Sequence, residues 1–370
     1  MNPALWELAR LLRRRIAVFD PVLLATIGLL AALSLVTMYS AAYDFPGRFQ
    51  GHLRNMLIAF IVMWAAASVP PALMMRAAVP LFVAGIALLL AVALFGDISK
   101  GARRWLDLGF ARIQPSELLK VATPLLLAWY FHHRQDSLQW FDYLIAALLL
   151  AIPVALIVRQ PDLGTALLVL AAGGGVIFLA GLSWKLIAGL LASGAAAMPL
   201  VWSLLHDYQR QRILTLIDPS ADPLGKGFHT IQSTIAVGSG GTFGKGWMQG
   251  TQTHLEFIPE RTTDFIFAVF SEEFGLAGNL LLLTIYMLLI TRGLLISGRA
   301  QNVFARLLAG ALTLIFFVYA FVNMGMVSGV LPVVGVPLPL MSYGGTAMVS
   351  LGMGAGLLMS IARHRKRAPV

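Results

Sequence analysis

Residues 255–275 read LEFIPERTTDFIFAVFSEEFG, and this stretch decides the class of fold. Three charged residues, Glu260, Arg261 and Asp264, lead directly into an apolar run that continues to residue 291. Such a run is long enough to form a helix that spans a bilayer. An ionisable side chain costs about 2.5 kcal/mol or more at the bilayer centre, so charges in a membrane helix usually mark a functional site. Asp264 falls in the first turn of the predicted helix, where an aqueous loop meets lipid.

The composition of the whole chain is that of a polytopic membrane protein. Of its 370 residues, 58% are hydrophobic and 12% charged, and the mean hydropathy is +0.80; soluble domains carry about 25% charged residues. The absence of cysteine excludes disulfides, thiolate metal sites and cysteine nucleophiles. The net charge of +10 indicates membrane topology and contact with anionic lipid. No nucleic-acid-binding motif is present, and we expect no nucleic-acid partner.

Apolar runs separated by glycine, proline and charged residues predict ten membrane helices. They lie near residues 20–41, 53–70, 73–95, 115–132, 140–158, 163–182, 185–205, 264–291, 303–328 and 343–362. Arginine-rich segments at both ends predict that both termini are cytoplasmic, which requires an even number of spans. Residues 4–16 are predicted to form a basic amphipathic helix on the inner surface.

The expected fold is therefore an all-α integral membrane protein with a single domain over residues 1–370. A long periplasmic loop, residues 206–262, precedes the eighth predicted helix. The predicted outward loops are rich in positive charge, which suits an anionic lipid-linked ligand such as a pyrophosphate. The basic residues considered for this contact are Arg103, Arg104, Arg210, Arg212, Arg261 and Lys120. Any one of them could instead be a solvated surface residue.

Two Gln-Pro segments open predicted helices and carry acidic residues. In QPSELLK (114–120), Glu117 and Lys120 are three positions apart and share one face of a helix. They form either a structural ion pair or a pair that lines a polar cavity. In QPDLGT (160–165), Asp162 either caps its helix or supplies a second carboxylate to the same cavity.

Two glycine-rich segments also need an interpretation. GSGGTFGKG (238–246) lacks the glycine spacing and the Ser or Thr of a phosphate-binding P-loop, and we expect a flexible turn. LPVVGVPLPLMSYGG (331–345) interrupts an apolar region with prolines and glycines. Broken backbone at membrane depth is tolerated only where protein or a water-filled cavity satisfies it. This segment therefore predicts a site, to which Asn323, Ser342 and Tyr343 could supply polar contacts.

Two further carboxylates, Glu272 and Glu273, lie inside the predicted helix that begins at Asp264. Glu272 lies about 12 Å deeper than Asp264 on roughly the same face, by the rise of a helix. These carboxylates either belong to the same site or pair with Lys120.

Several long motifs resemble those of the SEDS family (shape, elongation, division and sporulation). They are ISKGARRWLDLG, QPSELLK, QPDLGT, DYQRQRI, DPLGKGFHTIQS, LEFIPERTTDFIFAVFSEEFG and GVLPVVGVPLPLMSYGG. The resemblance runs from the first predicted helix to the last. The residues of these motifs are more similar to the family members that act in cell elongation than to those that act in cell division, although a cell-division member would perform the same chemistry.

The resemblance implies a peptidoglycan glycosyltransferase that polymerises lipid II into glycan strands at the outer face of the cytoplasmic (inner) membrane. It implies as partners a class B penicillin-binding protein, which is a transpeptidase, and other proteins of the elongation complex. The family's essential aspartate corresponds to Asp264, and its Glu–Lys pair to Glu117 and Lys120. The aspartate of its QPDLGT motif corresponds to Asp162.

The chemistry of such a reaction sets its own requirements. An α-linked donor that gives a β-linked product implies inversion in a single displacement, with a carboxylate such as Asp264 as general base. Cations near the pyrophosphate leaving group would stabilise the transition state. A divalent cation, Mg²⁺ or Mn²⁺, could share that task, but the sequence gives no ligand set and the metal site stays unknown.

Two other functions fit the sequence. A flippase for the lipid-linked precursor needs polar groups along a whole transmembrane path, whereas the polar motifs here gather on the predicted outer side. The other possible function is that of a non-catalytic scaffold for wall synthases. If a single-span partner binds, we expect it on the predicted helix 303–328. The residues expected to make this contact are Phe316, Phe317, Tyr319, Ala309 and Gly310.

Overall fold

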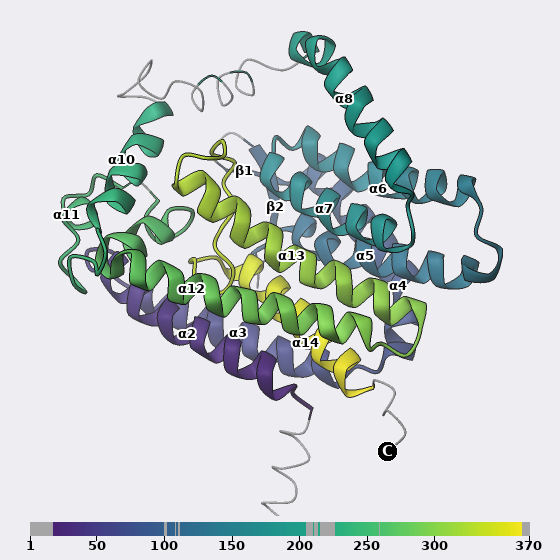
Figure 1. Ribbon diagram of the computed structural model, residues 1–370, viewed down its shortest axis with the longest axis horizontal. Coiled ribbons are helices and arrows are strands. Elements are labelled where there is room, and N and C mark those ends of the chain that lie inside the picture. Colours follow the sequence, from purple (N-terminus) through teal and green to yellow (C-terminus); the bar gives the residue numbers. More distant parts are fainter. Residues whose placement is uncertain are drawn as a thin grey trace, which may run out of the picture.

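The computed structural model describes residues 18–99, 102–107, 109, 112–204, 210, 214, 226–258 and 260–364. Long helices lie side by side, and α13 lies among α5, α7, α12 and α14 (Figure 1). In chain order the helices are α2 (Pro21–Ala41), α3 (Arg48–Ser68), α4 (Pro71–Phe95), α5 (Pro115–Arg134), the 3₁₀ helix η1 (Gln135–Ser137), α6 (Trp140–Arg159), α7 (Leu163–Leu179), α8 (Trp184–Leu204), α10 (Lys226–Ser239), α11 (Thr251–His254), α12 (Ile266–Gly298), α13 (Val303–Val327) and α14 (Gly345–Arg363).

Each predicted apolar range overlaps one of these helices. Proline opens α2, α4 and α5 at the first helical positions, where its fixed φ and missing N–H cost nothing. Within the described residues, six helices are long and apolar enough to cross a membrane, namely α2, α4, α6, α12, α13 and α14. The predicted amphipathic segment 4–16 lies outside the described residues.

The prediction of an all-α fold is wrong for the segment between α4 and α5. Here β1 (Asp97–Ser99), β2 (Ala102–Asp107) and β3 (Arg112–Ile113) form a small antiparallel sheet. Strand pairing gives the backbone N–H and C=O groups of this segment hydrogen-bond partners.

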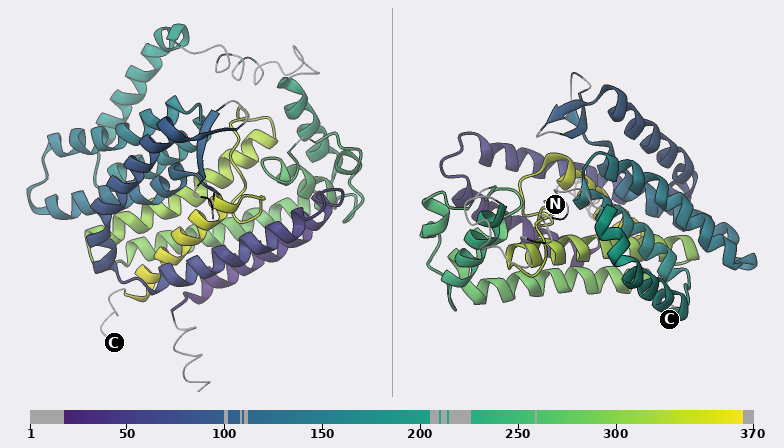
Figure 2. Two further views of the ribbon diagram at one scale, coloured as in Figure 1. Left: turned by 180° about the vertical axis from the view of Figure 1, so that it is seen from behind. Right: turned by 90° about the horizontal axis from the view of Figure 1, so that it is seen from above.

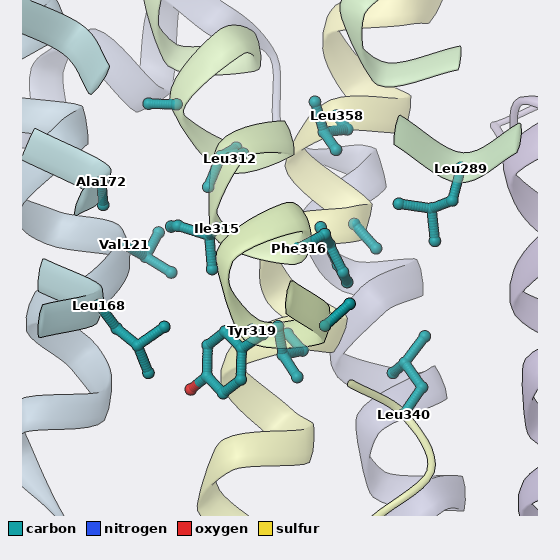
Figure 3. Close-up of a cluster of buried hydrophobic side chains, with 14 of the residues drawn as sticks. Val121, Leu168, Ala172, Leu289, Leu312, Ile315, Phe316, Tyr319, Leu340 and Leu358 are labelled. Carbon is teal, nitrogen blue, oxygen red and sulfur yellow. The ribbon is translucent and has the colours of Figure 1, made fainter. Parts of the chain in front are cut away.

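The centre of the bundle is built around α13. Figure 3 shows Ile315, Phe316 and Tyr319 of α13 between Val121 and Leu168 on one side and α12 and α14 on the other. Tyr319 is 0% exposed and Phe316 is 1% exposed. Such contacts leave little of α13 free for lipid or for a partner.

The predicted partner-binding face of 303–328 is therefore wrong for four of its five residues. Phe316, Tyr319, Ala309 and Gly310 are all buried, and only Phe317 is exposed, at 40%. An apolar helix with small residues can face protein or lipid, and here protein surrounds it.

Helix α8 differs from the rest in its surroundings. It lies apart from the other helices in Figure 1 and in the left view of Figure 2, and most of its described side chains are exposed. The predicted loop 206–262 follows it and contains α10 and α11. Helix α10 packs against α12 and so brings part of this loop to the start of that helix.

Candidate active site

Asp264 lies in the turn that precedes α12, two residues before the helix begins. Three contacts hold this turn. The Asn323 side-chain N–H donates to the Asp264 carbonyl at 2.8 Å and to the Val336 carbonyl at 2.7 Å. The Tyr343 N–H donates to the Thr262 carbonyl at 2.8 Å. The backbone of Asp264 is thus fixed by the end of α13 and by the segment between α13 and α14, while its side chain is half-buried.

The segment between α13 and α14 is non-helical, as its prolines and glycines predict. Gly335 lies beside the Asp264 carboxylate, because a Cβ at that position would be 3.4 Å from Oδ2. Ser342 is buried, and its hydroxyl accepts a hydrogen bond from the Leu338 N–H at 2.7 Å, which stabilises the segment itself. The start of α7 also meets this segment, since a Cβ at Gly164 would lie 2.9 Å from the Val334 carbonyl.

The two Gln-Pro segments lie next to each other. The Gln114 side chain, just before α5, donates to the Asp162 carboxylate at 3.0 Å. Asp162 also caps α7 by accepting from the Thr165 N–H at 3.1 Å. Asp162 is therefore a helix cap, as one of the two alternatives predicts, while its contribution of a second carboxylate to a cavity stays a prediction.

Glu117 and Lys120 form a buried ion pair, with Oε1 and Nζ 2.6 Å apart. The Lys120 ammonium also donates to the Tyr319 hydroxyl of α13, and the Ser350 hydroxyl of α14 donates to Glu117 Oε2 at 2.7 Å. This network joins α5, α13 and α14. Sequence reasoning missed Tyr319 and Ser350, because only the packing of three helices brings them to the pair.

We expect strong coupling between Glu117 and Lys120. Lys120→Met leaves the Glu117 carboxylate buried without its cation, which should cost about 3 kcal/mol of folding free energy. The double variant Glu117→Gln/Lys120→Met should cost less than the sum of the single variants, because no charge is left unpaired. Thermal unfolding in detergent of the four proteins measures this coupling, and strictly additive losses would contradict it.

The predicted pairing of Glu272 or Glu273 with Lys120 is wrong. Glu272 is 0% exposed and pairs with Lys245 at 2.8 Å. Its carboxylate also accepts from the N–H groups of Gln252 at 2.9 Å and Thr253 at 3.2 Å, and so caps α11. Lys245 comes from the segment between α10 and α11, whereas Lys120 bonds to Glu117 and Tyr319.

Glu273 is held by different groups. Its Oε1 atom accepts from the Ser40 hydroxyl of α2 and from the Met248 N–H at 3.2 Å. The two adjacent carboxylates thus both bind the loop between α10 and α12, and α2 joins the same cluster.

The glycine-rich segment 240–246 is not the flexible turn that its composition predicts. Gly275, with φ 63° and ψ −162°, breaks α12, and the segment lies in this break. Its backbone replaces the helical hydrogen bonds that the break removes. The four bonds are Leu276 N–Gly241 O at 2.9 Å, Ala277 N–Thr242 O at 2.9 Å, Lys245 N–Glu272 O at 3.0 Å and Gly246 N–Glu273 O at 3.1 Å. A Cβ at Gly244 would lie 2.0 Å from the Glu273 carbonyl, so only glycine permits this approach.

Arg261 is buried and holds the turn before Asp264 against α2. Its guanidinium donates to the Ala41 carbonyl at 2.9 Å and the Thr253 carbonyl at 3.2 Å, and it pairs with Asp44. Burial alone would raise the pKa of Asp44, but hydrogen bonds led by that from Arg261 hold it below its ordinary value. Protein groups thus occupy the Arg261 guanidinium.

The other basic residues predicted to contact the substrate, and Glu260, have different surroundings. Arg104 of β2 donates to the carbonyls of Gln160 at 3.1 Å and Pro161 at 2.5 Å, beside Asp162. Arg103 is exposed on the same strand. Arg210 donates to two carbonyls at the end of α8, and Arg212 lies outside the described residues. Glu260 accepts from the Thr263 hydroxyl at 3.1 Å in the exposed turn before Asp264.

Sequence reasoning missed one further cation, Arg48, which contacts the residue that holds the turn before Asp264. The Arg48 guanidinium, in the first turn of α3, stacks over the Tyr343 ring at 4.5 Å. Tyr343 is the residue whose N–H holds Thr262. Among the ion pairs of the described residues, none includes Arg48, so its charge is available to an anion.

The described residues contain no group of three or more His, Asp or Glu side chains arranged to bind a metal ion. The polar groups that are present suit proton transfer by a carboxylate and binding of an anion by helix starts and arginine.

Comparison with known proteins identifies the family. Residues 15–367 match the family of the cell cycle proteins FtsW, RodA and SpoVE. The peptidoglycan glycosyltransferase MrdB of Escherichia coli (strain K12) is 51% identical over 348 residues, which cover 94% of each chain. A probable peptidoglycan glycosyltransferase FtsW of Geobacter sp. (strain M18) is 35% identical over 369 residues, covering 96% of this chain and all of that one.

Solved structures show the same fold. A chain of a peptidoglycan synthase complex that coordinates polymerization and crosslinking is 35% identical, with a TM-score of 0.82 over 95% of this chain and 99% of that one. The rod shape determining protein RodA of Thermus thermophilus is 29% identical, with a TM-score of 0.72 over 95% of this chain and 98% of that one. The chain therefore belongs to the SEDS family of cell cycle proteins, which includes FtsW, RodA and SpoVE.

Proposed function

We propose that this chain, a peptidoglycan glycosyltransferase by its family and its relatives, polymerises lipid II at the site around Asp264. The observation that carries the proposal is the placement of Asp264. Its half-buried carboxylate lies at the end of the bundle where α5, α7, α12 and α14 begin. Helix starts carry partial positive charge, which favours an anionic substrate.

The reaction that fits this geometry is one inverting displacement. The acceptor sugar hydroxyl attacks the anomeric carbon of the donor, and Asp264 takes the hydroxyl proton. The new glycosidic bond forms as the bond from the anomeric carbon to the pyrophosphate oxygen breaks, and the electron pair leaves with the polyprenyl pyrophosphate. Arg48, which stacks on Tyr343 beside Asp264, is the cation best placed to stabilise the negative charge of the leaving group.

The distribution of site motifs and basic residues supports a site that faces the periplasm in the cytoplasmic membrane. QPSELLK, QPDLGT and the segment 331–345 meet at the end of the bundle with Asp264, and the sequence has arginines near both termini. By the positive-inside rule both termini are cytoplasmic, ten helices cross the membrane, and residues 206–262 form a periplasmic loop within a single domain, 1–370.

Cysteine labelling tests this topology in a chain that has no native cysteine. We expect Glu256→Cys to react with a membrane-impermeant maleimide in intact spheroplasts, because Glu256 is exposed beside α11. Asp136→Cys, on the exposed turn at the other end of α5, should react only after the membrane is permeabilised. The reverse pattern would overturn the orientation.

The proposed partner is a class B penicillin-binding protein that crosslinks the glycan product, together with other elongation-complex proteins. The structural likeness to a chain of a peptidoglycan synthase complex supports it. The exposed helix α8 leaves a part of the chain that a partner can order, which would raise polymerase activity. Labelled lipid II given to the purified chain with and without this partner tests the activity. Transbilayer movement alone would indicate a flippase, and neither activity would indicate a scaffold.

A further inference from the structure

A histidine from the outer loop lies directly beside the turn that carries Asp264. Helix α10 packs against α12, and the His229 ring stacks on the Phe265 ring with centroids 5.8 Å apart and an interplanar angle of 24°. Phe265 follows Asp264 in the chain and is buried. The imidazole is therefore fixed at the entrance to α12, on a part of the chain that the reaction described above does not use.

The His229 ring makes no hydrogen bond with a described residue. Nδ1 is buried and has no hydrogen-bond partner among the described residues. Nε2 also makes no hydrogen bond with them, and it is not among the buried atoms, so a ligand can reach it. Buried polar groups are nearly always hydrogen-bonded, and exceptions gather at functional sites. His52, His132 and His254 each also have a buried ring nitrogen without a partner, so His229 is distinguished by its position on Phe265, next to Asp264.

The surroundings of His229 keep the ring neutral. Burial lowers the pKa of His229 below its ordinary value, and the nearby Glu260 carboxylate only partly offsets this shift. On α12, which packs against α10, Glu272 pairs with Lys245, and Glu273 accepts hydrogen bonds from the Ser40 hydroxyl and the Met248 N–H. A neutral imidazole has one donor and one acceptor nitrogen. It suits a hydroxyl group better than a pyrophosphate, which favours cations.

We propose that His229 is a substrate-contacting residue whose Nε2 forms a hydrogen bond with a sugar hydroxyl of the lipid-linked disaccharide bound at Asp264. This assignment rests on the proposed function, since it needs a sugar at that position. The adjacent Phe265 ring sets the orientation of the imidazole, and α10 sets its distance from the carboxylate.

Two substitutions separate substrate contact from packing. His229→Phe keeps an aromatic ring on Phe265 and removes the hydrogen bond, whereas His229→Gln keeps a hydrogen-bonding group and removes the ring. We expect His229→Phe to lower kcat/KM for lipid II by about tenfold or more, the effect of losing one hydrogen bond at a desolvated site. His229→Gln should retain most of the activity. His133→Gln, an exposed histidine on α5, is the matched control and should behave as wild type.

The proposal would be overturned if His229→Phe were active and His229→Gln inactive, because this result would assign His229 to packing. Binding of fluorescent lipid II in nanodiscs, measured in the Asp264→Asn background, keeps this result separate from catalysis. There, adding His229→Phe should weaken binding by about tenfold and adding His229→Gln should not. Equal binding by all three proteins would also overturn it. Polymerisation by Asp264→Asn alone at the wild-type rate would instead contradict the proposed role of Asp264.

Discussion

Replacing Asp264 by asparagine should lower the rate of lipid II polymerisation by at least about 100-fold, the usual contribution of a general base. Asparagine has nearly the same size but cannot accept the proton of the attacking hydroxyl. The contacts that hold this turn, from Asn323 and Tyr343, reach backbone carbonyls and are unchanged by the substitution. The loss should therefore appear in kcat, with folding and binding of the partner retained.

The measurement is the initial rate of glycan formation by purified protein with its class B partner. Asp136→Asn removes a carboxylate from the exposed turn after α5 and is the matched control. Unfolding temperature and co-purification with the partner show that each variant is intact. An intact Asp264→Asn variant with a rate close to wild type would mean that another group takes the proton.

Replacing Glu272 by leucine should cost about 4 kcal/mol or more of folding free energy. Breaking a buried ion pair from one side costs about 3–5 kcal/mol, because the remaining charge has no partner. Here the loss also leaves the N–H groups of Gln252 and Thr253 without their acceptor. The segment that lies in the break of α12 should then detach, and the turn that carries Arg261 and Asp264 should lose its support from α11.

Thermal unfolding in detergent and the yield of monodisperse protein measure this effect. Glu272→Gln is the informative second variant, since the two backbone N–H groups bond to different carboxylate oxygens and its single amide oxygen can still accept from one of them. We expect it to recover part of the stability that leucine loses. A Glu272→Leu protein that unfolds at the wild-type temperature would show that Glu272 does not stabilise the loop.

The apolar runs predicted the helices well, because spanning length and the prolines at Pro21, Pro71 and Pro115 are local features. The i, i+3 spacing predicted the Glu117–Lys120 pair for the same reason. These inferences needed no knowledge of which helices are neighbours.

The contacts that sequence reasoning missed depend on packing between distant segments. Glu272 meets Lys245 only because Gly275 breaks α12 and residues 240–246 enter the break. Glycine spacing alone cannot distinguish such close approach from a flexible turn. Similarly, apolar and small residues occur on helix faces that are covered by protein and on faces that are covered by lipid. The sequence of α13 therefore predicts a partner contact for Phe316 and Tyr319, which other helices of the same chain cover.

Proteoliposomes that contain the purified chain, its class B penicillin-binding protein and labelled lipid II test the central claim most directly. The products are resolved by gel electrophoresis, and transbilayer movement of lipid II is followed in the same vesicles. We predict a ladder of glycan strands that grows with time, is increased by the partner and is absent with Asp264→Asn. Movement of lipid II across the bilayer without any polymer would contradict the assignment as a lipid II polymerase.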